Sequence, residues 1–182
     1  MDYDLIIRNT TIVDGTGGPT LLGSVAVKGD RIAAVGHVDG QGAREIDGAG
    51  LVTSPGFVDS HSHADASILA YPLAESLVMQ GITTFVGNNC GAALAPLRNS
   101  EQGRRAIERF GGNLADITWN TYGEWLARVE SNGLSVNYVP LAGHSAIRLA
   151  VMGADFKRES TPTELQAMAA HVTQAMDDGA FG

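Results

Sequence analysis

The chain has 182 residues, a hydrophobic content of 44% and a formal net charge of -8 at pH 7. An acidic protein of this kind is repelled by nucleic acid and by anionic membrane surfaces, so neither is expected as a partner. The single cysteine excludes an intrachain disulfide, and the first residues lack the basic and apolar segments of a signal peptide. No apolar run approaches the ~20 residues of a membrane span. These features predict a cytoplasmic protein.

Residues 1–54 have the pattern of a small β module. Short apolar and β-branched runs alternate there with glycine and aspartate, and the sequence Lys28-Gly29-Asp30-Arg31 suits a type II′ hairpin turn. We therefore predict a small antiparallel, β-sandwich-like module. Because few strands bury little apolar surface, such a module should pack on something larger or be completed by other strands.

From Pro55 onwards the pattern changes to strand, helix, strand, which indicates βα units and a parallel sheet. Thr121 and Thr161 each begin a capping box, with a glutamate three residues later, at the start of a helix. Strands are predicted up to the histidine pair at 61–63, at 82–86 and at 136–142, and helices at 72–81, within 101–109, from 121 to 132 and at 162–178.

The predicted fold class is α/β, a small antiparallel β module followed by about the first three βα units of a (β/α)₈ TIM-type barrel. The 128 residues from 55 to 182 are about half of the ~250 residues of a closed barrel. The barrel is therefore expected to be truncated, with residues 55–182 as its N-terminal part and the rest needed for completion.

Two histidines one residue apart, His61 and His63, lie at the end of the first predicted strand. Side chains alternate with a period of two along a strand, so both imidazoles should point the same way, as two ligands of one metal ion would. Ordinary hydrogen-bonded strand histidines are the alternative. Asp59 would share their side. Asp65 would lie beyond the strand, where it either orients a ligating imidazole or caps a turn.

Cys90 follows the second predicted strand as the histidines follow the first, and the carboxyl ends of parallel strands lie together. Because Zn²⁺ accepts mixed nitrogen and sulfur ligands, we expect the thiol to share a metal with His61 and His63. The alternative is a small buried side chain. His144, after the third strand, is a candidate third imidazole or substrate contact, and the alternative is a hydrogen-bonded histidine beside a turn. Arg148 is a candidate partner for a substrate carboxylate, and the alternative is an ordinary surface arginine.

The segment Pro55-Gly56-Phe57-Val58-Asp59-Ser60-His61-Ser62-His63 resembles the entry to the barrel of the metal-dependent amidohydrolase superfamily. Residues 80–84, 89–91, 143–144 and 178–182 narrow this resemblance to the D-aminoacylases, the N-acyl-D-amino-acid deacylases. Two positions depart from the family's pattern. Asn88 stands where glycine usually precedes Asn-Cys-Gly, and Ala64 stands where an aspartate is common. Asparagine tolerates a left-handed backbone, so the turn should survive.

The resemblance implies a zinc-dependent hydrolase of linear amides, with one or two Zn²⁺ ions and a small-molecule N-acyl-D-amino acid as substrate. His61 and His63 would hold one metal, and Cys90 would ligate the tightly bound zinc. The remaining zinc histidines and the aspartate that acts as general acid and base are expected beyond residue 182, so this portion alone should be inactive. A hydantoinase-like hydrolase of cyclic amides and a non-catalytic half-barrel fragment are the competing hypotheses.

Overall fold

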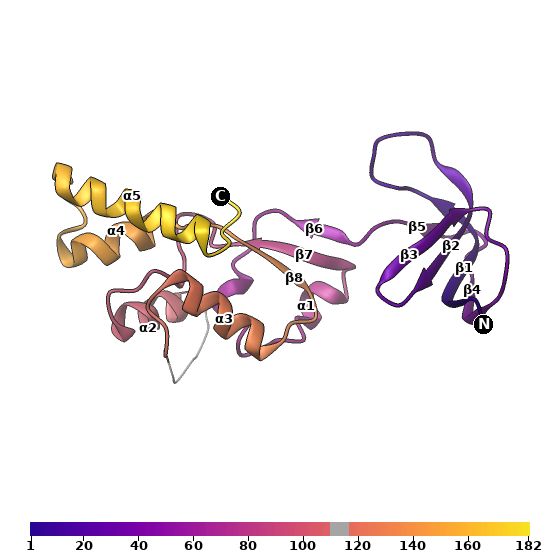
Figure 1. The fold of residues 1–182 in the computed structure, drawn as a ribbon, viewed down its shortest axis with the longest axis horizontal. Coiled ribbons are helices and arrows are strands. Elements are labelled where there is room, and N and C mark those ends of the chain that lie inside the picture. The colour runs from indigo at the N-terminus through magenta and orange to yellow at the C-terminus, as the bar shows by residue number, and fades with distance from the viewer. Residues whose placement is uncertain (110–116) are drawn as a thin grey trace. The chain divides into compact units, whose positions relative to one another are not determined.

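The computed structural model describes residues 1–109 and 117–182, which form two compact units, Met1–Pro55 and Gly56–Gly182. The first unit consists of strands, and the second combines strands with helices (Figure 1). The chain is therefore α/β, as predicted. Among the described helices, none has the length and apolar character needed to cross a membrane.

The first unit is one five-stranded sheet around β1 (Tyr3–Ile12). β2 (Leu21–Lys28) pairs antiparallel with β1 and with β3 (Arg31–Gly36). β4 (Gly42–Asp47) and β5 (Val52–Thr53) instead run parallel to β1. The prediction of a wholly antiparallel module was therefore wrong. After β3 the chain crosses to the far side of β1 before it forms β4, and such a crossover returns the strand in the parallel direction.

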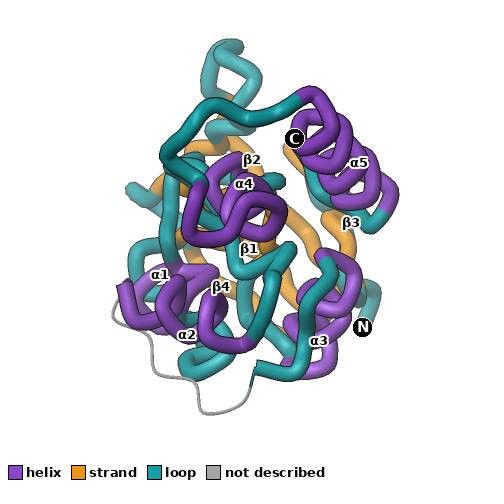
Figure 2. Tube along the Cα trace, turned by 90° about the vertical axis from the view of Figure 1, so that its left-hand side faces the viewer, coloured by secondary structure: helices purple, strands orange, loops and turns teal. Residues whose placement is uncertain are grey.

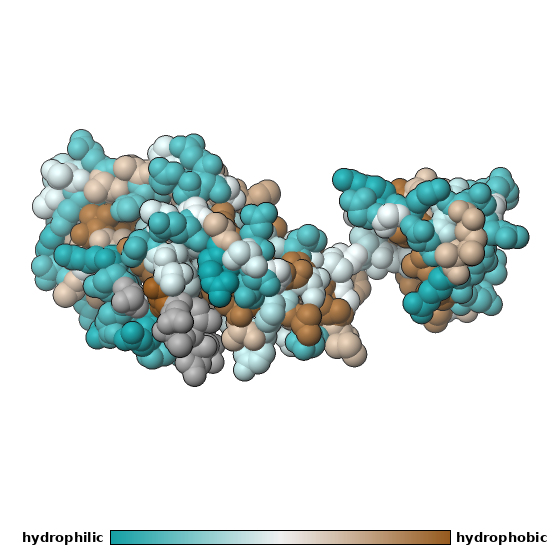
Figure 3. Space-filling view, turned by 60° about the horizontal axis from the view of Figure 1, so that its bottom comes forward, coloured by the Kyte–Doolittle hydropathy of each residue, from teal (hydrophilic) through white to brown (hydrophobic). Residues whose placement is uncertain are grey.

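Local turn chemistry in this unit follows the sequence. Gly29 and Asp30 connect β2 to β3, and Gly29 has a φ of 60°, as the first central residue of a type II′ turn requires. The core is small and consists of Ile6, Ala26 and Val38. Large apolar side chains also remain on the surface of the unit (Figure 3), namely Leu21, Leu22, Ile32, Val35, Leu51 and Val52. Exposed apolar side chains of this kind on a small sheet suit coverage by another part of the protein.

The second unit contains a three-stranded parallel sheet, with β7 (Ile82–Gly87) between β6 (Phe57–Asp59) and β8 (Asn137–Pro140). Sequential order of parallel strands is what successive βα units produce. The helices are α1 (Glu75–Val78), α2 (Ser100–Arg109), α3 (Tyr122–Asn132), α4 (His144–Met152) and α5 (Pro162–Asp177), with short 3₁₀ turns η1 (Ala64–Ala66) and η2 (Gly153–Asp155). α4 and α5 pack against each other (Figures 1 and 2).

Two predicted elements are shorter than expected. β6 ends at Asp59, so the histidine pair lies beyond the regular strand. The helix expected over residues 72–81 is reduced to the single turn α1, because Ala74 adopts a left-handed conformation with φ of 46° and cannot belong to a right-handed helix. Both predicted capping boxes are present, at Thr121 and at Thr161.

The core of the second unit is aromatic. The Trp119 and Trp125 rings lie 4.9 Å apart between centroids, and Phe85 of β7 stacks on Tyr138 of β8 at the same separation. Phe85 and Trp125 are fully buried. This packing fixes the sheet against α3 and leaves the carboxyl ends of the strands to build a site.

Replacing Phe85 by alanine should destabilise the second unit by about 3–5 kcal/mol, because it deletes a fully buried ring and leaves a cavity. Trp119 and Trp125 are the two tryptophans of the chain, so urea unfolding followed by tryptophan fluorescence reports on this unit. Met79→Ala is the control, since that side chain is 84% exposed. A Phe85→Ala loss no larger than that of the control would contradict the packing described.

Candidate metal centre

His61, His63 and Cys90, hereafter the His-His-Cys cluster, meet beyond the carboxyl ends of β6 and β7. The Nε2 of His61 lies 3.2 Å from the Sγ of Cys90, and the two imidazole centroids are 5.8 Å apart. One ligand atom from each residue lies within 4.8 Å of the other two. Within the described part of the chain, no other three His, Cys, Asp or Glu residues converge in this way. Two imidazole nitrogens and a thiolate are donors that Zn²⁺ accepts, so this cluster fits part of a zinc site.

The histidines are brought together by the loop that follows β6, since regular strand geometry stops before them. The Asp59 carboxylate accepts a hydrogen bond of 3.1 Å from the His61 backbone N–H. The Ser62 N–H donates to the Val86 carbonyl at 3.0 Å and so continues the contact with β7 past the last ladder residue. Strand alternation was therefore an incomplete reason for expecting two converging imidazoles.

The loop after β7 is tightly wound in a left-handed conformation. Asn88, Cys90 and Gly91 have φ values of 62°, 58° and 73°. At the start of α4, the backbone N–H groups of Ser145 and Ala146 donate to the Gly91 carbonyl at 2.8 and 3.2 Å. Cys90 is exposed, so the alternative of a small buried side chain does not hold in this structure.

The two candidate carboxylates take different positions. Asp59 stays next to the cluster through its bond to His61. Asp65 lies in η1, is 3% exposed, and accepts a 3.2 Å bond from the Asn88 N–H. Burial raises the pKa of Asp65 above its ordinary value. The Asp65 carboxyl group therefore binds the backbone of the loop after β7 and is not one of the donors of the His-His-Cys cluster.

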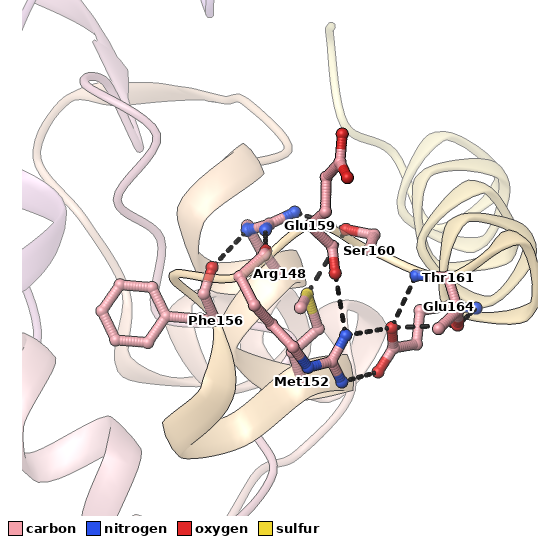
Figure 4. A network of polar contacts seen from close by, with 8 residues as sticks. Arg148, Met152, Phe156, Glu159, Ser160, Thr161 and Glu164 are labelled. Atoms are coloured by element: carbon pink, nitrogen blue, oxygen red, sulfur yellow. Dashed lines mark hydrogen bonds and ion pairs between the residues drawn. The ribbon is translucent and has the colours of Figure 1, made fainter.

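His144 and Arg148 lie on α4 and are not among the converging donors of the cluster. His144 is the exposed first residue of the helix. Arg148 points to the connection between α4 and α5 (Figure 4), where its Nε donates to the Phe156 carbonyl at 2.6 Å and its Nη1 to Ser160 Oγ at 2.5 Å. Its Nη2 donates to the Arg158 carbonyl. These bonds occupy the guanidinium group within the protein and favour a structural role over the predicted contact with a substrate carboxylate.

A cavity of about 460 Å³ opens beside Cys90. Ala92, Leu149 and Phe156 supply apolar parts of its wall, and Arg98 and Gln102 supply polar ones. The role of these residues could not be predicted from the sequence, because the segment after Cys90 has no periodicity that indicates its contacts with α4. The same holds for Tyr122 and Tyr138, whose hydroxyl groups hydrogen-bond to Asn88 in the loop after β7.

The sequence matches no protein-family model. It is 41% identical over 180 residues to an N-acyl-D-aspartate deacylase of Alcaligenes xylosoxydans xylosoxydans, an alignment that covers 98% of this chain and 36% of the relative. A D-aminoacylase of the same organism is 35% identical over 191 residues, which cover 99% of this chain and 37% of the relative. This chain is homologous to the N-terminal part of the D-aminoacylases.

Solved structures agree with the D-aminoacylase homology. A D-aminoacylase with a binuclear metal centre superposes with a TM-score of 0.86 at 36% identity, over 99% of this chain and 38% of its own. An N-acyl-D-glutamate deacylase from Bordetella bronchiseptica, in complex with zinc and a phosphonate inhibitor, superposes with a TM-score of 0.87 at 31% identity. The superposition covers 99% of this chain and 37% of the deacylase. The chain thus spans little more than a third of the length of these D-aminoacylase relatives.

Cys90→Ala should abolish tight zinc retention, because it removes the only sulfur donor of the cluster. Zinc content after dialysis against a weak chelator, measured by elemental analysis, checks this. His171→Ala is the matched control, since His171 lies on α5 outside the cluster. If the Cys90 variant kept the zinc content of the parent protein, the thiol would not be a ligand.

The start of α5 should carry a pH-dependent ion pair. The Arg158 guanidinium, which donates to the Glu164 carboxylate at 2.6 Å, and then the Thr161 backbone N–H, which donates to it at 2.8 Å, together lower the pKa of that carboxyl from 4.5 to about 2. The ion pair therefore stabilises the fold fully at pH values above the ordinary glutamate pKa of 4.5. This stabilisation is lost as the pH falls toward 2. The stability difference between the parent and Glu164→Gln should shrink from about pH 5 to about pH 3 in urea unfolding. Glu159→Gln is the control, and a pH-independent difference would refute the pair.

Proposed function

We propose that this chain is the N-terminal portion of a zinc-dependent N-acyl-D-amino-acid deacylase, which hydrolyses an N-acyl-D-amino acid to a carboxylate and a D-amino acid. The observation that carries the proposal is the 3.2 Å approach of His61 Nε2 to Cys90 Sγ at the ends of two adjacent parallel strands. Sequence identity of 41% to an N-acyl-D-aspartate deacylase and of 35% to a D-aminoacylase supports the same reaction class.

We further propose that the three βα units belong to a (β/α)₈ barrel whose remaining strands lie outside this chain, with residues 55–182 as its N-terminal part. The backbone of Phe181 donates to the Pro140 carbonyl at 2.8 Å, and that of Ala142 donates to the Gly182 carbonyl at 2.7 Å. These bonds are what the first residues of a further parallel strand beside β8 would make. β6 is paired on one side only among the described strands, and its Phe57 and Val58 are exposed, which suits a continuing sheet.

Part of the predicted apolar stripe on α5 also lies in water. Met168 is buried, whereas Leu165, Val172 and Met176 are exposed. Three exposed apolar side chains on one helix support its coverage by neighbouring units of a complete barrel. The small β module would likewise gain strands or packing from elsewhere in the complete protein.

In the complete enzyme, His61, His63 and Cys90 would hold zinc, in a centre of one or two ions. Bound zinc supplies a Lewis acid that polarises the acyl carbonyl and lowers the pKa of a water molecule. The apolar wall of Ala92 and Phe156 next to Cys90 would accommodate the acyl group and keep bulk water from it. The general acid and base is expected beyond residue 182. An exposed metal-binding thiol also suits a reducing cytoplasm.

Two other functions stay in competition. A hydantoinase-like cyclic amide hydrolase is compatible with the fold, since an L-hydantoinase from Arthrobacter aurescens superposes with a TM-score of 0.53. Its 20% identity supports the fold alone. A non-catalytic half-barrel would keep the fold without the chemistry, but it gives no reason for three metal donors to converge within 4.8 Å.

The test is hydrolysis by the complete protein, assayed with N-acetyl-D-aspartate, N-acetyl-D-leucine, their L enantiomers and a cyclic ureide. The proposal predicts release of D-amino acid only, and loss of that activity after zinc removal with recovery on zinc addition. Activity on the ureide alone would contradict the deacylase proposal and favour the hydantoinase hypothesis. Hydrolysis by the isolated 182-residue chain would overturn the proposal that the rest of a barrel is needed.

A further inference from the structure

Asn88 is the first residue of the left-handed turn that presents Cys90 and is only 2% exposed. Its side-chain amide donates to the Leu141 carbonyl at 2.7 Å and to the Tyr122 hydroxyl at 3.4 Å. Its Oδ1 accepts from the Tyr138 hydroxyl at 3.0 Å, and its backbone N–H donates to Asp65 Oδ1 at 3.2 Å. Every polar group of the side chain is therefore engaged inside the protein.

The partners of Asn88 come from different parts of the second unit. Asp65 belongs to η1, Tyr122 to α3 and Tyr138 to β8. The network is braced, because the Tyr122 hydroxyl also donates to the Leu141 carbonyl at 3.0 Å and the Tyr138 ring stacks on Phe85. A buried polar network holds one geometry firmly, since any displacement leaves a donor or acceptor unpaired.

We propose that Asn88 is a positioning residue for the Cys90 thiol. The left-handed turn from Asn88 to Gly91 is anchored at one end by the Asn88 network and at the other by the two α4 amides on the Gly91 carbonyl. With both ends fixed, the two residues between them have little freedom, and Sγ is held 3.2 Å from His61 Nε2. This deepens the proposed function, because it rests on the zinc site assigned there.

The nearest alternative is that Asn88 stabilises the core without affecting the thiol. A merely structural asparagine would lower the unfolding temperature on substitution but leave metal affinity and ligand geometry unchanged in the molecules that fold. A positioning residue changes both in the folded protein. Outer partners of metal ligands commonly affect metal affinity by about 10–100-fold when they are removed.

Asn88→Gly is the informative variant. Glycine adopts a φ of 62° without strain, so the backbone path of the turn stays allowed while the amide contacts are lost. Tyr138→Phe is the milder second variant, because it removes only the hydroxyl that donates to Asn88 Oδ1 and keeps the stacked ring. Asn9→Gly is the matched control. Asn9 is also left-handed, with φ of 57°, but lies on β1 in the first unit.

The experiment titrates the metal-free complete protein with Co²⁺, alone and against a competing chelator. The readouts are the dissociation constant and the thiolate-to-cobalt charge-transfer absorption, with near-UV circular dichroism as the check of folding. Asn88→Gly should bind Co²⁺ about 10–100-fold more weakly, with a reduced or shifted charge-transfer band. Tyr138→Phe should show a smaller change in the same direction, and Asn9→Gly should match the parent.

Parent-like affinity and absorption in folded Asn88→Gly would overturn the proposal. If that variant does not fold, unchanged cobalt binding by Tyr138→Phe overturns it instead. Absence of the thiolate band in the parent protein would also refute it, together with the assignment of Cys90 as a ligand. Because no hydrolysis is measured, a protein that passes this test but has no deacylase activity would contradict the proposed function and leave the role of Asn88 in place.

Discussion

The candidate site depends on two adjacent parallel strands, β6 and β7, that end side by side. The loops that follow these strands bring their side chains together. β6 delivers His61 and His63, and β7 delivers Cys90, with a nitrogen-to-sulfur separation of 3.2 Å. Parallel pairing alone would bring the strand ends near each other. The hydrogen bonds of Asp59 and Ser62 then carry the alignment past the end of β6.

The loop that carries Cys90 is fixed at both ends by hydrogen bonds, at Asn88 and at Gly91. Left-handed residues other than glycine are uncommon and persist where the surroundings fix them. Here the surroundings are a buried polar network under Asn88 and the first amides of α4 on Gly91. Arg148 contributes at a distance, because its three donors tie α4 to the segment that connects it to α5 and so hold the helix whose backbone amides bind the Gly91 carbonyl.

Features set by nearby residues could be predicted from the sequence. The capping boxes at Thr121 and Thr161, the Gly29-Asp30 turn and the order of the βα units follow from local chemistry and periodicity. The candidate donors were also identifiable, because their spacing relative to strand ends predicts a common location. The comparisons agree with the family resemblance, in its N-terminal part.

Features set by distant pairing could not be predicted. The parallel direction of β4 depends on which side of β1 the chain reaches, and the partners of Arg148 and Asn88 lie on other elements. The shortening of the helix near residue 74 likewise required the backbone conformation. For β4, Arg148 and Asn88, the deciding contact joins distant segments whose pairing the pattern of hydrophobicity does not encode.

The proposed zinc site requires Cys90 and the two histidines to bind the same metal ion. Zinc K-edge X-ray absorption of the zinc-loaded complete protein tests it most directly. We expect a first shell with one sulfur scatterer together with the multiple scattering of imidazole rings. A shell of nitrogen and oxygen only, in a protein that retains its zinc and its fold, would contradict it.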